Sequence, residues 1–163
     1  MRIEFLNKAE AEFVFPRLFA ILHSNMSLIA PTGNSYDEDI SQWLSYMKSD
    51  LEKETRQILL LRDGEEIIGF FQYSVNNGVL MMERIQFLEQ YKGTGIFTEL
   101  YRFLVSIIPP DTCFVEAYAH KNNEKSIGVL THLGLSIIGE NKNGISYHFR
   151  GEYRNLMEKY GTK

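Results

Sequence analysis

The sequence has little cysteine, no long apolar run and no excess of basic residues, and each absence excludes a class of protein. Cys113 is the single cysteine among 163 residues, so no disulfide can form within the chain and no thiolate cluster can hold zinc. No window approaches the ~18–20 apolar residues that span a bilayer, and residues 1–5 carry charges where a signal peptide is apolar. We expect a soluble cytoplasmic protein without a membrane partner, and Cys113 as a small buried residue of an apolar strand.

The charge balance is mildly acidic, with 17 Lys and Arg against 21 Asp and Glu and a net charge of −4. Proteins that grip nucleic-acid phosphates carry basic surfaces, so nucleic acid is not an expected partner. Hydrophobic residues make up 44% of the chain, enough for a sizeable core. Because compact domains mostly contain ~100–150 residues, the length predicts one domain over residues 1–163.

Hydrophobic periodicity predicts both helices and strands. The predicted strands cover residues 1–6, 57–62, 66–75, 79–88, 112–119, 135–139 and 145–150. The predicted helices cover residues 8–24, 35–51, 96–108 and 122–134, with a short polar helix at 153–160. This order predicts an α/β (α+β) domain, with a mixed sheet and helices on both of its faces.

The stretch from Gln90 to Gly95 joins a predicted strand to a predicted helix. Gly93 and Gly95 let the backbone turn sharply and approach a ligand. The helix N-terminus that follows offers unpaired amides and a positive dipole end, and Lys92 adds a cation. The pattern indicates a pyrophosphate cradle, although a turn whose glycines serve only packing is the alternative. It has neither the Gly-Lys-Ser/Thr ending of a Walker loop nor the third glycine of a dinucleotide fingerprint.

On these residues the chain resembles the GCN5-related N-acetyltransferase (GNAT) family over essentially its full length. The family's loop, Gln/Arg-x-x-Gly-x-Gly/Ala, is matched by Gln90, Gly93 and Gly95. A second family motif has an Asn opening the last major helix, a small residue three positions later and a Gly–aromatic pair at the helix end. The matching residues here are Asn123, Ser126, Gly134 and Leu135.

The resemblance also has a finer part. The spacing from Glu116 to Gly134 is similar to the branch that includes ribosomal-protein N-terminal acetyltransferases. The family fold that the resemblance implies has a central, mostly antiparallel sheet with one splayed pair of parallel strands.

The resemblance implies acetyl-CoA as the cofactor and no metal ion. The pantetheine arm would pair with the backbone amides of Ile85 and Phe87, and the Ile85 amide would polarise the thioester carbonyl. Asn123 would hydrogen-bond the pantetheine with Ser126 nearby, and a helix N-cap role for Asn123 is compatible with this. The pyrophosphate would meet six consecutive amides, those of Lys92, Gly93, Thr94, Gly95, Ile96 and Phe97.

The reaction implied is direct attack of an amine on the thioester, which requires a base to deprotonate an ammonium. The carboxylate that fits the family is Glu83, four residues before Phe87, and its alternative is an exposed carboxylate paired with Arg84. Competing candidates are Glu116, Tyr118 and His120, which alternate onto one face of the next strand. A histidine at a strand end can also be merely solvated.

One position departs from the family pattern. Many relatives carry a Tyr seven residues after the helix-opening Asn, where its hydroxyl protonates the leaving thiolate, but this chain has Leu130. The general acid is therefore not assigned, and the candidates are Ser126, Tyr118 and water. A free thiol with a pKa of ~8.5 leaves fairly well unaided, and in the ribosomal-type branch this position is commonly aliphatic.

The resulting prediction is an acyltransferase, an acetyl-CoA-dependent N-acetyltransferase for a primary amine of a small molecule or peptide, acting as a monomer or homodimer. A non-catalytic acyl-CoA-binding sensor or interaction module is the second interpretation, and Leu130 is the residue that supports it. A nucleotide-binding regulatory domain is the third.

Overall fold

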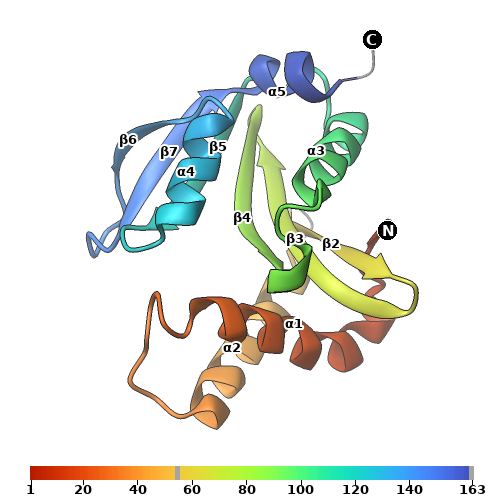
Figure 1. The fold of residues 1–163 in the computed structure, drawn as a ribbon, viewed down its shortest axis with the longest axis vertical. Helices are drawn as coiled ribbons and strands as arrows, with labels where there is room; N and C mark the ends of the chain where they lie inside the picture. Colours follow the sequence, from red (N-terminus) through yellow and green to blue (C-terminus); the bar gives the residue numbers. More distant parts are fainter. Residues whose placement is uncertain (54–55, 162–163) are drawn as a thin grey trace. The chain divides into compact units, whose positions relative to one another are not determined.

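The computed structural model describes residues 1–53 and 56–161. Its strands are β1 (Arg2–Phe5), β2 (Arg56–Asp63), β3 (Glu66–Asn76), β4 (Val79–Phe87), β5 (Phe114–His120), β6 (Ser136–Glu140) and β7 (Ser146–Glu152). Its helices are α1 (Ala11–Met26), α2 (Tyr36–Leu51), α3 (Ile96–Ile107), α4 (Glu124–His132) and α5 (Tyr153–Tyr160), with short 3-10 turns η1 (Lys8–Glu10) and η2 (Glu89–Tyr91). The element order expected from the sequence is confirmed (Figure 1).

The strands form a mixed sheet, which confirms the predicted fold class. They are hydrogen-bonded in the order β1-β2-β3-β4-β5-β7-β6. The β4–β5 pair is parallel, whereas the β1–β2, β5–β7 and β6–β7 pairs are antiparallel. The chain divides into two compact units, unit 1 with Met1–Tyr73 and Arg84–Lys92, and unit 2 with Ser74–Glu83 and Gly93–Lys163. Strands β3 and β4 contribute residues to both units.

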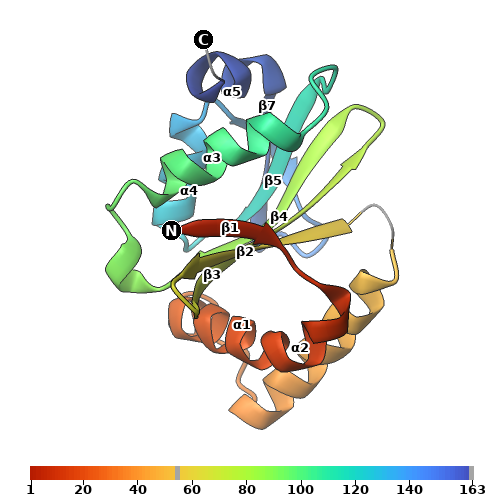
Figure 2. The same ribbon diagram turned by 90° about the vertical axis from the view of Figure 1, so that its right-hand side faces the viewer.

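In unit 1, α1 and α2 cover one face of β1, β2 and β3 (Figure 2). Ser35 caps α2, since its side chain accepts a hydrogen bond from the Glu38 amide at 3.2 Å. Trp43 and Met47 of α2 are buried in the core that these helices form with Phe70 of β3. Trp43 and Met47, spaced four residues apart on α2, therefore serve packing.

A buried charged group ties α2 to the strands of unit 1. Asp50 is 7% exposed and Gln72 of β3 is fully buried. Gln72 Nε2 donates to Asp50 Oδ2 at 3.0 Å, Arg56 Nη1 lies 2.6 Å from Asp50 Oδ1, and Arg84 Nη1 donates to Gln72 Oε1 at 2.8 Å. Burial acts to raise the pKa of Asp50, but the Gln72 hydrogen bond and the Arg56 and Arg84 charges outweigh it, so the pKa lies below 3.8.

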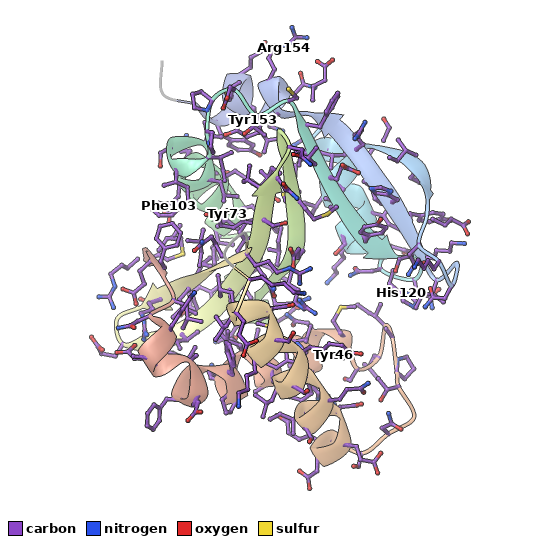
Figure 3. The ribbon with its side chains drawn as sticks, turned by 180° about the vertical axis from the view of Figure 1, so that it is seen from behind. Tyr46, Tyr73, Phe103, His120, Tyr153 and Arg154 are labelled. Carbon is purple, nitrogen blue, oxygen red and sulfur yellow. The ribbon has the colours of Figure 1, made fainter. Side chains whose placement is uncertain are left out.

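In unit 2, α4 lies over one face of β5 and β7 (Figure 1). Helices α3 and α5 pack together, with the rings of Tyr101 and Tyr160 5.3 Å apart. Tyr153, which opens α5 and is labelled in Figure 3, is fully buried. The expectation that Cys113 is a buried strand residue is wrong, because β5 begins one residue later and Cys113 is exposed directly before it.

Two properties bear on function. No helix among the described residues is long and apolar enough to cross a membrane. Nor does any group of three His, Cys, Asp or Glu side chains within residues 1–53 and 56–161 form a candidate metal site.

Candidate active site

The loop after β4 uses two glycines in the left-handed region of backbone space. Gly93 has a φ of 79° and Gly95 a φ of 85°. A Cβ at either position would meet no atom within 4 Å. The backbone conformation, rather than crowding, therefore requires glycine at both positions.

Helix α3 starts at Ile96 with Gly95 as its N-cap, and no side chain caps it. The Ile96 amide, at the first position of the helix, has no acceptor within the helix itself. A phosphate oxygen would satisfy this amide and would also gain from the positive end of the helix dipole. The loop therefore fits the pyrophosphate that the sequence predicts there.

Lys92 is held differently from the expectation. Its amide donates to the Glu89 carbonyl at 3.1 Å, closing the turn η2 that contains Gln90. Its ammonium lies 2.6 Å from Glu89 Oε2. The amide of Lys92 is thus engaged in this structure and the charge of its ammonium is partly balanced, which weakens the expectation that Lys92 itself holds phosphate.

The end of β4 in unit 1 is anchored by a residue that sequence reasoning missed. Asn25, in the last turn of α1, donates through Nδ2 to the Phe87 carbonyl at 2.8 Å and to Gln86 Oε1 at 3.0 Å. The Leu88 amide donates to Ile68 O of β3 at 2.8 Å. Because amide directions alternate along a strand, the Phe87 amide points away from β3. Ile85, two residues earlier, shares this direction.

Strands β3 and β4 approach each other closely near this point. A Cβ placed on Gly69 of β3 would lie 2.6 Å from Gln86 O. No side chain fits there, so glycine is required by contact rather than by dihedral angle.

In unit 2, β4 and β5 pair in parallel over four residues each. The register runs from Val79↔Phe114 to Met82↔Ala117. Glu83, the predicted base, follows the last paired residue of β4 and is half-buried. Tyr118 follows the last paired residue of β5. The structure thus places Glu83 and Tyr118 just after the end of one ladder.

Glu116 is surrounded by partners from β7. It is 8% exposed, its Oε1 lies 2.5 Å from His148 Nε2, and its Oε2 accepts from Arg150 Nη2 at 3.3 Å. Tyr118 stacks on the His148 ring, with centroids 4.4 Å apart and planes 16° apart. The structure therefore brings Glu116 and Tyr118 together through His148. The available signal was the alternation of residues 146–150 as a strand, which puts His148 and Arg150 on one face.

The residues at the start of α4 act on the backbone. Asn123 Oδ1 accepts from the Ser126 amide at 3.2 Å, so Asn123 is the N-cap of α4. His120 Nδ1 accepts from the Asn122 amide at 3.0 Å, which occupies one ring nitrogen. Leu130, at the position where relatives carry a Tyr, is 6% exposed and belongs to the core.

Comparisons with known proteins agree with this geometry. Residues 17–135 match the profile of a family described as the acetyltransferase (GNAT) family. A search of curated protein sequences found no match.

Three solved structures share the fold at low identity. An acetyltransferase from Thermus thermophilus is 15% identical, with a TM-score of 0.71 over 93% of this chain and 97% of that one. The PaiA N-acetyltransferase of Thermoplasma acidophilum, in complex with coenzyme A, is 15% identical, with a TM-score of 0.65 over 94% and 100%. The aminoglycoside acetyltransferase AAC(6')-Ib, in complex with coenzyme A and kanamycin, is 16% identical, with a TM-score of 0.67 over 98% of each chain.

Proposed function

Because the chain belongs to the GNAT acetyltransferase family, we propose that it transfers the acetyl group of acetyl-CoA to a primary amine of a small molecule or peptide. Acyl transfer from acetyl-CoA follows from family membership, and the amine acceptor and the direct attack are the proposal. The observation that carries it is the uncapped start of α3, reached through two positive-φ glycines.

Each part of the candidate site has a role in this reaction. In unit 2, the first-turn amides of α3 would hold the phosphates of the donor substrate. In unit 1, the backbone of β4 at Ile85 and Phe87 would pair with the pantetheine arm, and Asn25 holds the end of that strand in place. An amide donor at Ile85 would stabilise charge that develops on the thioester oxygen.

A base must take a proton from the acceptor, which reaches the enzyme as an ammonium ion. The sequence predicts Glu83, which lies directly after the last β4–β5 pair. Thiolate departure without a protein acid fits the apolar Leu130, since a thiol of pKa ~8.5 is a fair leaving group.

The second candidate function is a non-catalytic acyl-CoA-binding module, and buried Leu130 is the observation that favours it. Calorimetry with acetyl-CoA and an assay of thiol release separate the two functions. Useful acceptors are a polyamine, kanamycin and a peptide with a free N-terminus. We expect binding, together with thiol release above the rate of acetyl-CoA hydrolysis for at least one amine. Binding without release would favour the module, and absence of binding would contradict both functions.

A matched pair of glycine variants tests the phosphate-binding loop. Gly95→Ala strains the start of α3 by ~1–2 kcal/mol and should weaken acetyl-CoA binding about tenfold. Gly33→Ala introduces the same kind of strain, since Gly33 has a φ of 78° and no atom within 4 Å of its Cβ position. It should leave binding unchanged. If the two variants bind acetyl-CoA with equal affinity, the loop containing Gly95 is not part of the acetyl-CoA site.

Further features of the proposal concern the acceptor and the setting. The net charge of −4 favours a cationic acceptor. The likeness of residues 116–134 to the ribosomal-protein branch supports including a peptide N-terminus in the panel. We place the activity in the cytoplasm. We expect a monomer or a homodimer, and size-exclusion chromatography with light scattering tests this oligomeric state.

A further inference from the structure

Four side chains of unit 2 form a cluster on one face of β5 and β7: Glu116, Tyr118, His148 and Arg150. Register pairs Glu116 with Arg150 and Tyr118 with His148, and paired residues of neighbouring strands share a face. Figure 1 shows α4 over one face of these strands, and Figure 3 views unit 2 from behind, with His120 at the end of β5.

The contacts of Glu116 fix the orientation of the His148 ring. A carboxylate only accepts hydrogen bonds, so at the 2.5 Å contact His148 Nε2 carries the proton. In the neutral ring the lone pair then lies on Nδ1, and no hydrogen bond from the described residues reaches that atom. Tyr118 stacks on one ring face, and Arg150 holds the second carboxylate oxygen. The imidazole is fixed, while 21% of its side chain is exposed.

The cluster also lies beside the end of the β4–β5 ladder. The last pair is Met82↔Ala117, and the next residue of β5 is Tyr118, which pairs with His148. Within unit 2, this places His148 beside the residue that follows the last paired residue of β5, at the same end of the ladder as Glu83, the base that the sequence predicts.

We propose that His148 is the catalytic base for the acceptor amine and that Glu116 positions it. This inference rests on the proposed function, and it assigns to His148 the proton that the sequence assigns to Glu83. His148 Nδ1 takes a proton from the ammonium, and the neutral nitrogen attacks the thioester carbonyl carbon. A C–N bond forms and the C–S bond breaks with its electron pair on sulfur. The second nitrogen proton neutralises the thiolate, and the imidazolium returns its proton to solvent.

The first test is His148→Gln, whose amide can still donate to Glu116 but cannot take up a proton. We expect kcat to fall about 100-fold or more, with the KM for acetyl-CoA unchanged, using the fastest amine of the panel. His132→Gln, at the end of α4, is the matched control and should keep wild-type activity. If His148→Gln retains wild-type kcat, the assignment of His148 as the base is overturned. A wild-type protein that releases no thiol would instead contradict the proposed function itself.

Two further variants separate catalysis from structure. His148→Ala leaves room for free imidazole, which should restore a concentration-dependent part of the lost kcat. Glu116→Gln should lower kcat about tenfold at constant KM, because the ring loses its carboxylate partner. Absence of imidazole rescue in a folded His148→Ala, checked by circular dichroism, would contradict the role as base. A Glu116→Gln variant with wild-type kcat would remove Glu116 as the positioning residue.

Discussion

Two buried carboxylates, Asp50 in unit 1 and Glu116 in unit 2, are nearly equally shielded, at 7% and 8% exposure. Asp50 is bound by the Gln72 amide and the Arg56 guanidinium, which only donate to it. Glu116 also has an arginine partner, but its shortest contact is to His148, whose neutral imidazole has one donor and one acceptor nitrogen. A buried carboxylate with fixed partners serves the fold, whereas one with a histidine partner can serve proton transfer.

The largest expected effect on stability comes from Asp50→Ala. It removes the acceptor of the buried Gln72 amide and the carboxylate that faces Arg56, so we expect a loss of about 2–3 kcal/mol in the free energy of unfolding. Urea denaturation measures it, and kcat of the folded fraction should stay near wild type. A stability loss under about 0.5 kcal/mol would show that solvent replaces the lost contacts.

The matching change at Glu116 should show the opposite pattern. Glu116→Gln keeps the shape of the side chain and an oxygen acceptor for Arg150, so we expect less than about 1 kcal/mol of destabilisation. Its main effect should be on kcat. If urea denaturation gives it the same stability cost as Asp50→Ala, the distinction between the two carboxylates is lost.

The pH dependence of stability should identify Asp50 as well. Because its folded pKa lies below 3.8, the unfolded chain binds the proton more readily. The stabilisation by Asp50 is therefore fully present above pH 3.8 and is lost as the pH falls through the lower folded pKa. The stability difference between wild type and Asp50→Asn should narrow over this range in urea titrations. A constant difference between pH 6 and pH 2 would contradict it.

The smallest effect is expected at an exposed ion pair. Arg154 Nη2 lies 2.9 Å from Glu152 Oε2, but their side chains are 70% and 56% exposed. Arg154 is the second residue of α5 and is labelled in Figure 3. Solvent screens such pairs, so Arg154→Ala should change stability by less than about 0.5 kcal/mol. A cost comparable to that of Asp50→Ala would mean that burial does not control these energies.

Local patterns predicted most of the fold. The period of apolar residues located every helix and strand to within a few residues, because each element buries one face. The glycine loop was also predictable, since Gly93 and Gly95 adopt the conformation that their residue type suggests. The Lys92–Glu89 ion pair was missed although the two residues are only three positions apart. From sequence alone, the carboxylate of Glu89 could equally well be solvated and unpaired with Lys92.

The long-range contacts of the site could not be predicted in the same way. Asn25 meets Phe87 across 62 positions, and His148 meets Glu116 across 32. Such contacts depend on which strands pair and in which register, and β6–β7 pairing shifts register between Ile137 and Gly139. The contact between His148 and Glu116 therefore becomes visible only once β7 is placed beside β5.

The close approach at Gly69 has a consequence for mutational tolerance. Any side chain at this position would collide with the Gln86 carbonyl, 2.6 Å from an added Cβ, although Gly69 carries no chemistry. In a saturation library selected for acetylation, Gly69 should be as depleted of substitutions as a reactive residue. Intolerance to substitution at Gly69 would thus reflect the close spacing of β3 and β4, and a selection for folding alone should show the same depletion.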